Sequence, residues 1–369
     1  MSHHQASTLP ALLFTESSIN LGGQELQALQ QMTALNELGY QTILLCKRGS
    51  AIAAAAQLRG LRFLTLPFKN AFDVKSIFGV SKLIRQLRPI ALMCHGSRDA
   101  LVSAFAIKCV SFLGVGSPKL FRIKTFQQGR PLSFAYNYLF TGTLVPSEHL
   151  RQKFLVNQWI RSNKVQVLYP GVNFALLGAV STLPEALLQW LDAHPGPMIS
   201  HGAVLRGEKG HATILKALLI VRKQFPSIRY VIAGDGHDRS LLEQRIRDLD
   251  LTQNVFLAGH LSSVAPLLKR SDLAVLPSLR EPLGMFQIEA QYLEVPVIAS
   301  DVDGIPETIL HQKTGLLIKH GDAEEWAASI LWILNNQVLA KELAVEGNRY
   351  VSQKFSIEKN TQALLKLIR

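Results

Sequence analysis

The stretch 272–307 constrains the fold of this chain more strongly than any other part of the sequence. It opens with a short apolar run, Asp272–Leu276, continues through a turn-rich loop, and predicts a helix over Met285–Leu293. A second apolar run, Pro296–Ala299, follows this helix. A strand, a helix and a second strand in this order predict one β-α-β unit.

The same alternation of short apolar runs and helical stretches recurs along the chain. Helical stretches such as Val74–Leu87 and Ser147–Phe154 separate short apolar runs. This alternation predicts parallel sheets covered by helices on both faces, in which ligands gather at the carboxyl ends of the strands. The other runs expected to be strands are Ala11–Thr15, Gln41–Cys46, Leu61–Leu66, Ile90–Cys94, Lys119–Ile123, Thr143–Val145, Val165–Leu168, Met198–Ser200, Tyr230–Ala233, Val255–Leu257 and Gly315–Ile318.

The length of 369 residues predicts two domains, because a single hydrophobic core usually stops growing below this size. The segment that ends at Pro197 contains Gly, Pro and little periodicity beyond Pro184–Leu191, so we expect the linker there. The predicted domains are residues 1–180 and residues 181–350, followed by a terminal helical segment, residues 351–369.

The helix predicted within 272–307 offers a place for an anion. Its start leaves the backbone N–H groups of Leu283, Gly284 and Met285 without partners inside the helix, and such an end attracts phosphate. Glu281 precedes this end and Glu289 lies roughly two turns beyond it. A carboxylate in an anion-binding loop needs another task, and accepting hydrogen bonds from sugar hydroxyls is one. The alternative interpretation is a surface helix with two solvated glutamates.

A second loop with anion-binding chemistry follows the run at Met198–Ser200. Glycines surround Arg206 and Lys209 in HGAVLRGEKGH, and a helix is expected over Ala212–Gln224. Two cations and the N–H groups of a helix end suit a diphosphate, whereas a cationic surface loop is the alternative. The turn that begins at Gly234 contains G-x-G but lacks the third glycine of a dinucleotide fingerprint, so a nicotinamide site is not expected.

Candidate ligand contacts in the first half also follow predicted strands. Gly22 and Gly23 lie where the chain turns from strand to helix. They either serve the turn alone or let a ligand approach bare backbone, and Gly23 is the preferred contact. His95, followed by Arg98 and Asp99, is either an ordinary hydrogen-bonded residue or a contact to an acceptor substrate.

The net charge of +12 lies in the first half of the chain. Residues 1–180 carry 19 Lys and Arg against 6 Asp and Glu, whereas the remainder carries 20 against 21. This asymmetry predicts an anionic membrane surface, a phosphorylated glycolipid or nucleic acid as partner, with solubility as the alternative explanation. Nucleic acid is not favoured, because the interleaving of aromatic and basic residues found in single-strand binders is missing. Arg122, Lys124 and Arg130 are candidates for an acceptor phosphate, or are simply solvated.

No stretch approaches the roughly 20 apolar residues of a membrane span. Residues 1–10 show no basic-then-apolar pattern of a signal peptide, so a cytoplasmic location is expected, with association at the inner face of the cytoplasmic membrane as an option. Cys46, Cys94 and Cys109 lack the spacing of metal ligands, so neither a zinc site nor a disulfide framework is expected. Cys46 and Cys94 end apolar runs and are interpreted as small buried thiols.

The spacing E-P-L-G-x-x-x-x-E from Glu281 to Glu289, followed by A-x-x-x-x-x-P-V-I-A-S and G-I-P-E, resembles the signature of the retaining GT-B glycosyltransferases of family 4. The loop around Lys209 is similar to the G-R-L-x-x-x-K-G element of that family, with Ala203 and Val204 as departures. The resemblance implies two Rossmann-like α/β/α domains that face each other across a cleft. It also implies a terminal helix that crosses back to the first domain.

The resemblance further implies a role for each candidate residue. The second domain would bind a nucleotide-diphosphate sugar and the basic first domain an anionic glycolipid or glycan acceptor. No cofactor or metal is expected, and Asp301-Val302-Asp303, which has the letters of a D-x-D motif, is interpreted as a structural turn. The assignments are Glu281 to the donor sugar, Glu289 to the ribose, Lys209 and Arg206 to the diphosphate, Gly23, Gly234, Leu283, Gly284 and Met285 to the nucleotide, and His95 to the acceptor.

The sequence therefore predicts a retaining glycosyltransferase that moves a hexose-type sugar to an envelope glycan or glycolipid of the lipopolysaccharide type. The family is generally thought to react on one face of the sugar through the donor phosphate. Two alternatives remain open. One is a non-catalytic nucleotide-sugar-binding scaffold of an envelope assembly, and the other is a sugar-nucleotide epimerase or hydrolase on the same fold.

Overall fold

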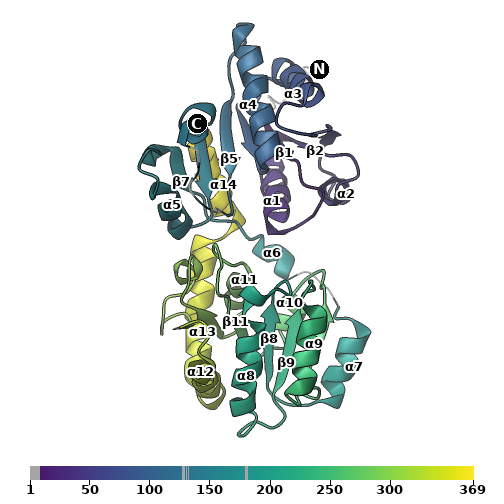
Figure 1. The fold of residues 1–369 in the computed structure, drawn as a ribbon, viewed down its shortest axis with the longest axis vertical. Helices are drawn as coiled ribbons and strands as arrows, with labels where there is room; N and C mark the ends of the chain where they lie inside the picture. Colours follow the sequence, from purple (N-terminus) through teal and green to yellow (C-terminus); the bar gives the residue numbers. More distant parts are fainter. Residues whose placement is uncertain (1–8, 127–128, 130, 132, 179–181) are drawn as a thin grey trace, which may run out of the picture. The chain divides into compact units, whose positions relative to one another are not determined.

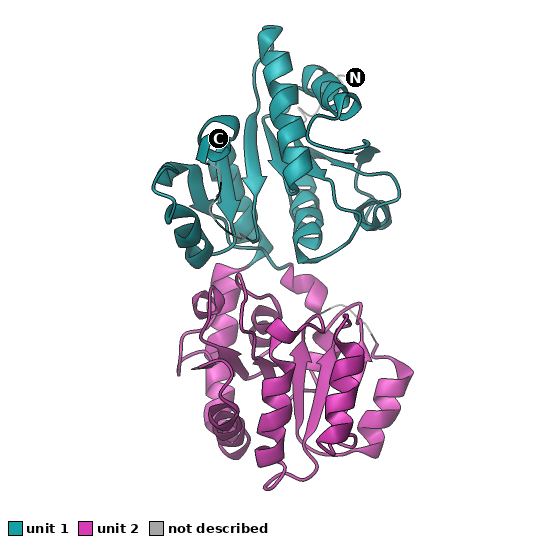
Figure 2. Cartoon of the chain, in the orientation of Figure 1, with its two compact units in different colours: residues 1–172, 356–369 teal, residues 173–355 magenta. Residues whose placement is uncertain are grey.

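The structure is a computed structural model that describes residues 9–126, 129, 131, 133–178 and 182–369. It divides into two compact units, shown in different colours in Figure 2. The first unit consists of Met1–Val172 and Ser356–Arg369, and the second of Asn173–Phe355. The chain thus leaves the first unit after Val172 and returns to it at Ser356. The domain boundaries expected from the sequence were at residues 180 and 350.

A parallel sheet forms the centre of the first unit (Figure 1). Among the described residues it has seven strands in the order β3-β2-β1-β4-β5-β6-β7, and each neighbouring pair is parallel. The order reverses between β1 and β4, and at such a switch point the loops diverge and leave room for a ligand. The strands are β1 (Leu9–Glu16), β2 (Tyr40–Cys46), β3 (Phe63–Thr65), β4 (Ala91–Cys94), β5 (Lys119–Ile123), β6 (Gly142–Val145) and β7 (Val165–Val167).

Helices cover both faces of this sheet. Successive side chains of β1 point to opposite faces, so that Leu12 and Phe14 belong to one core and Leu13 belongs to another. The helices are α1 (Gly23–Glu37), α2 (Ala51–Leu58), α3 (Val74–Leu87), α4 (Ser97–Phe112), α5 (Glu148–Leu155) and α14 (Ile357–Ile368), together with a π-helical turn at Ala135–Leu139 and a 3₁₀ turn at Ser162–Lys164.

The last helix of the chain, α14, is part of the first unit. Leu364 and Ile368 are buried in the core that also contains Leu12 and Phe14. Asn360 ties the helix to the rest of the unit, because its Oδ1 accepts from Gln31 at 2.9 Å and its Nδ2 donates to the Tyr169 carbonyl at 2.6 Å.

The second unit repeats this architecture. Its described residues form a six-stranded sheet in the order β10-β9-β8-β11-β12-β13, again with parallel neighbours. The order reverses between β8 and β11, which makes their carboxyl ends the switch point of this sheet. The strands are β8 (Met198–Gly202), β9 (Arg229–Ala233), β10 (Val255–Gly259), β11 (Leu273–Leu276), β12 (Val297–Ser300) and β13 (Leu316–Ile318).

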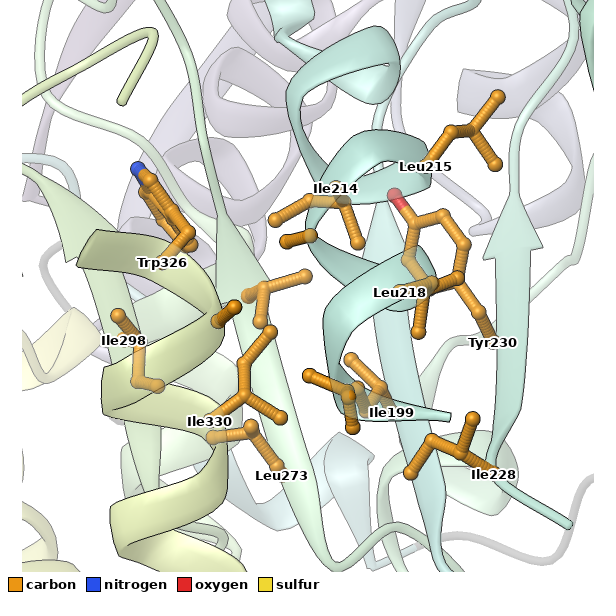
Figure 3. Close-up of a cluster of buried hydrophobic side chains, with 14 of the residues drawn as sticks. Ile199, Ile214, Leu215, Leu218, Ile228, Tyr230, Leu273, Ile298, Trp326 and Ile330 are labelled. Atoms are coloured by element: carbon orange, nitrogen blue, oxygen red, sulfur yellow. The ribbon is translucent and has the colours of Figure 1, made fainter. Parts of the chain in front are cut away.

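The larger core of the second unit lies between one face of this sheet and the helices that cover it. Figure 3 shows Ile214 and Leu218 from one helix and Trp326 and Ile330 from another above the strands. Trp326 is fully buried, and its indole N–H donates to the Lys319 carbonyl at 3.2 Å. The helices of this unit are α6 (Phe174–Leu177), α7 (Glu185–Ala193), α8 (His211–Val221), α9 (Arg239–Asp248), α10 (Ala265–Leu268), α11 (Phe286–Tyr292), α12 (Ala323–Asn335) and α13 (Gln337–Lys354).

Each strand expected from the sequence is confirmed, with ends that differ by a few residues. The helices α4 and α9 were not predicted, so Arg98 and Asp99 prove to lie in the first turn of a helix. Cys46 and Cys94 are buried free thiols, as expected. In the part of the chain that the structure describes, none of the helices combines the length and the apolar composition needed to cross a membrane.

Candidate functional site

The loops after β8 and β11 meet at the switch point of the second sheet. β8 is followed by a 3₁₀ turn, Gly207–Lys209, and then by α8, whereas β11 is followed by the loop that leads to α11. The Leu279 N–H donates to the Glu208 carbonyl at 2.7 Å and joins the two loops. Gly210 permits this approach, because a Cβ at Gly210 would lie 1.9 Å from the Pro277 carbonyl oxygen.

Lys209 and Glu281 form an ion pair at this junction. Lys209 Nζ lies 2.6 Å from Glu281 Oε2, and the two side chains are 12% and 15% exposed. The backbone of Glu281 is also held, since its N–H donates to Asp303 Oδ2 at 3.0 Å and its carbonyl accepts from the Gly304 N–H at 3.1 Å. The structure therefore brings these two predicted site residues together. It also shows that Asp303, which the sequence analysis assigned to a structural turn, fixes the Glu281 backbone.

The backbone just before α11 offers unused hydrogen-bond donors. Met285 is the N-cap of α11 and supplies no side-chain cap. The N–H groups of Leu283, Gly284 and Met285 donate to no acceptor among the described residues. Gly284 has a φ of +87°, a backbone conformation that favours glycine, and a Cβ there would also displace the Gln287 side-chain amide, which lies 2.4 Å away. These donors lie in the loop that carries Glu281.

Glu289 lies on α11 with its carboxylate half-buried. Burial raises the pKa of Glu289 from its usual 4.5 to about 7. The carboxylate makes no hydrogen bond or ion pair with the residues described. A half-buried carboxyl without a donor is suited to accept hydrogen bonds from the hydroxyls of a bound ligand.

Arg206 does not join the Lys209–Glu281 pair. Its guanidinium Nη2 lies 2.9 Å from Glu208 Oε1, and both of these side chains are more than 40% exposed. Gly234 has a packing role, because a Cβ there would lie 1.9 Å from the Ala203 carbonyl oxygen. Gly234 therefore lets the chain leaving β9 pass close to the chain leaving β8.

The switch point of the first sheet borders a hollow of about 570 Å³. The hollow lies at the carboxyl ends of β1 and β4 and at the starts of α1 and α4. Polar and charged side chains dominate its wall. The lining residues are Glu16, Ser17, Ser18, Ile19, Gln24, Glu25, Lys47, Gly96, Ser97 and Arg98.

Two buried carboxylates, Glu16 and Asp99, lie at this switch point. Burial, together with the negative charge of Asp99, raises the pKa of Glu16 from its usual 4.5 to about 7. Glu16 accepts hydrogen bonds from the Ser18 N–H at 2.7 Å and from Gln24 Nε2 at 3.2 Å. Asp99 Oδ2 accepts from the Thr15 hydroxyl at 2.6 Å. Glu16 was not among the predicted site residues, although a carboxylate at the end of an apolar strand is a signal that could have identified it.

His95 and Gly23 do not line this hollow. The His95 ring is 5% exposed, stacks on Phe14 with the ring centroids 6.0 Å apart, and has Nδ1 3.2 Å from the Thr15 carbonyl. Burial lowers the pKa of His95, so the ring is neutral at neutral pH. Gly23 is the exposed first residue of α1, and a Cβ there would meet nothing within 4 Å, so packing does not require glycine at this position.

Among the three cations suggested for an acceptor phosphate, Arg122 is engaged within the protein. Its Nη2 donates to the Ser97 hydroxyl at 2.7 Å, and its guanidinium lies 5.3 Å from the centre of the Tyr136 ring. Burial lowers the pKa of Lys124, and the charge of Arg122 adds to this effect. Arg130 lies outside the described residues. Within the described ranges, no group of three or more His, Cys, Asp or Glu residues is arranged to hold a metal ion.

The comparisons with known proteins point to one family. Residues 193–350 match the family model described as "Glycosyl transferases group 1". The capsular polysaccharide biosynthesis glycosyltransferase CapM of Staphylococcus aureus is 24% identical over 298 residues, which cover 77% of each chain. The lipopolysaccharide core biosynthesis glycosyltransferase LpsE of Rhizobium meliloti is 29% identical over 196 residues, which cover 53% of this chain and 56% of LpsE.

A solved structure of similar fold is that of the Anabaena protein HepE in complex with UDP. The superposition covers 97% of this chain and 99% of HepE with a TM-score of 0.82, at 18% identity. These likenesses confirm the predicted fold class of two Rossmann-like domains of the GT-B type. The family match confirms the expected enzyme class, a glycosyltransferase, for the domain at residues 193–350.

Proposed function

We propose that this protein is a retaining glycosyltransferase that moves a hexose-type sugar from a nucleoside-diphosphate donor to an envelope glycan or glycolipid. The observation that carries the proposal is the partly buried Lys209–Glu281 pair at the switch point of the domain that matches glycosyl transferases group 1. A pair of opposite charges in this place suits a ligand with an anionic diphosphate next to a sugar rich in hydroxyls.

The hard step of such a transfer is departure of the nucleoside diphosphate, whose negative charge grows as the bond to the sugar breaks. Fixed positive charge and oriented N–H groups lower the energy of that state. Lys209 supplies the charge, and the free N–H groups of Leu283, Gly284 and Met285 supply donors. Arg206 supplies a second cation to the diphosphate after its guanidinium separates from Glu208. We propose that these groups act without a metal.

The ion pair gives Glu281 two tasks in this proposal. In the free protein it holds Lys209 in place at 2.6 Å. When the diphosphate takes over Lys209, the Glu281 carboxylate is released to accept hydrogen bonds from hydroxyls of the donor sugar. Glu289, which lacks a protein donor, accepts from the ribose. In the proposed function Gly23 and Gly234 contact the nucleotide. His95, with a neutral imidazole ring, contacts the acceptor.

The proposed donor is a UDP-sugar, supported by the UDP bound to HepE. The proposed acceptor is an anionic envelope glycan or glycolipid of the lipopolysaccharide type. It is supported by the roles of CapM in capsular polysaccharide biosynthesis and of LpsE in lipopolysaccharide core biosynthesis, and by the basic first half of this chain. The proposed location is the cytoplasm, at the inner face of the cytoplasmic membrane.

The test separates nucleotide binding from transfer. UDP, GDP and ADP are screened by thermal shift, since a true ligand stabilises the fold by mass action. Lys209→Ala should weaken binding of the stabilising nucleotide at least tenfold, because it removes a charge-assisted contact worth roughly 1.5–3 kcal/mol. Glu281→Gln should retain nucleotide binding and lose transfer, measured as release of the nucleoside diphosphate from its sugar donors.

Lys216→Ala is the matched control, because Lys216 is an exposed lysine on α8 of the same unit. Full transfer by both site variants would overturn the proposed roles. Nucleotide binding without turnover of any sugar donor would favour the scaffold alternative, and release of free sugar or an epimerised donor would favour the hydrolase or epimerase. The anomeric configuration of the product, read by NMR, tests retention separately.

A further inference from the structure

In residues 61–120 of the first unit, the positively charged side chains are mostly exposed and the negatively charged ones are buried. This segment contains nine Lys and Arg residues, eight of which are exposed. Its two carboxylates, Asp73 and Asp99, are both buried. None of the exposed cations here forms an ion pair with a residue that the structure describes. The exposed side chains of the segment therefore carry positive charge that no ion pair neutralises among the described residues.

The exposed side chains of the helix α3, which is labelled in Figure 1, concentrate this charge. Lys75, Phe78, Lys82 and Arg85 recur at intervals of three or four residues and are all exposed, whereas Val80 and Ile84 are buried against the core. Residues at this spacing lie on one side of a helix. The exposed side of α3 is thus a cationic stripe that includes an aromatic ring.

Large apolar side chains are exposed at the start of the same stripe. Phe72 is 70% exposed, Val74 is 76% exposed and Phe78 is 64% exposed. The Phe72 ring packs 5.2 Å from the Phe105 ring of α4, so its position is fixed by the fold. We call Phe72, Val74, Lys75, Phe78, Lys82 and Arg85 the α3 face.

The acidic residue nearest to this face is turned inward by its own hydrogen bonds. Asp73 Oδ2 accepts from the Ser76 hydroxyl at 2.7 Å and from the Lys69 N–H at 3.2 Å. The Ser76 hydroxyl also accepts from the Phe68 N–H at 2.9 Å. Asp73 therefore serves to start α3 and does not neutralise the cations on the exposed side.

We propose that the α3 face is a docking surface for an anionic lipid bilayer. Lysine and arginine side chains bind anionic headgroups, while exposed phenylalanine and valine side chains enter the boundary between headgroups and acyl chains. Nucleic acid would satisfy the cations alone and would leave the apolar side chains in water. The inference goes beyond the proposed reaction, since binding to a bilayer does not require transfer.

The test measures binding of the full chain to vesicles by sedimentation. Vesicles of pure phosphatidylcholine are compared with vesicles in which about a third of the lipid is phosphatidylglycerol, at about 0.05 M and about 0.5 M salt. The protein should sediment with the anionic vesicles at low salt only. K75E/K82E/R85E should weaken this binding by at least tenfold, because it replaces three cations that attract anionic headgroups with carboxylates that repel them.

K216E/K223E/R247E is the matched control, because it changes the net charge equally at three exposed cations of the second unit. It should bind the vesicles almost as the wild type does. Phe78→Ala should weaken vesicle binding and leave the salt dependence unchanged, because it removes apolar contact only. Thermal melts confirm that each variant is folded, and nucleotide binding, measured separately, should be unaffected by all four substitutions of the α3 face.

Three results would overturn the proposal. The wild type could fail to bind anionic vesicles at low salt. The two triple variants could lose vesicle binding equally, which would mean that only net charge matters. Random duplex DNA could bind the wild type as tightly as the vesicles do, with the same loss in K75E/K82E/R85E, which would assign the α3 face to nucleic acid.

Discussion

Nucleotide binding should become tighter as the pH rises, and Glu289 should be the cause. In the free protein burial holds the pKa of Glu289 at about 7, so roughly half of the carboxyl groups are protonated at neutral pH. Hydrogen bonds from ribose hydroxyls favour the charged form and lower the pKa of this group in the complex. By linkage, a ligand that lowers a pKa binds more tightly above it and releases a proton on binding.

The size of the effect follows from this pKa. If the complex returns Glu289 to its usual 4.5, affinity follows the ionised fraction of the free carboxyl. That fraction is about one-eleventh near pH 6 and about ten-elevenths near pH 8, so UDP should bind about tenfold more tightly at the higher pH. Binding near pH 7 should release about half a proton.

Isothermal titration calorimetry with UDP measures both quantities, since buffers with different ionisation enthalpies reveal the released proton. Glu289→Gln is the control, because a glutamine keeps an acceptor oxygen and does not titrate. The phosphate of UDP titrates in the same range and contributes equally to both proteins. An equal pH dependence in wild type and variant would refute the assignment of Glu289 to the ligand.

Three further predictions concern stability and metals. Glu16→Gln should raise the melting temperature near pH 8 and leave it almost unchanged near pH 5. Folding raises the pKa of Glu16 from 4.5 to about 7, so the protonated carboxyl stabilises the folded state at low pH. This contribution to the free energy of unfolding, at most about 3 kcal/mol, is lost as the pH rises from 4.5 to 7. Gly210→Ala should lower the melting temperature more than Gly259→Ala, because both glycines have positive φ but only Gly210 lies against a backbone oxygen, that of Pro277; calorimetric scans showing equal shifts would contradict this. Transfer should persist in EDTA, because Lys209 and backbone N–H groups are proposed to meet the leaving group, and an activity lost in EDTA and restored by Mg²⁺ would contradict that proposal.

The strands could be predicted because their signal is local. The run Lys119–Ile123, for example, is apolar at three of its five positions, and β5 begins and ends at the expected residues. The helix α4 was missed because small and polar residues such as Ser97 and Ser103 weaken its apolar periodicity, and tertiary packing stabilises it instead. The local sequence pattern thus predicted the strands more completely than the helices between them.

The candidate site was accessible to sequence reasoning only in part. Spacing placed Glu281 in a loop and Lys209 before a helix, but their contact at 2.6 Å depends on β8 and β11 being neighbours in the sheet. No local pattern encodes that adjacency. Glu16 was missed for a related reason, since its raised pKa arises from burial and from Asp99, which lies on a different element. The contact expected at Gly23 stays a prediction, because the space around this residue is open and packing does not explain the glycine.

The two units share a feature that neither packing nor charge balance explains. Each has a glutamate near its switch point, Glu16 or Glu289, whose pKa burial raises to about 7. Above that pH a buried carboxylate destabilises the folded chain, and a glutamine of the same size would avoid this cost. In the proposed function this cost is offset at Glu289 when a ligand supplies the missing donors, because hydroxyl hydrogen bonds stabilise the ionised carboxylate. The prediction that Glu16→Gln stabilises the free protein and the prediction that Glu289→Gln flattens the pH dependence of binding therefore test the same principle in the two units.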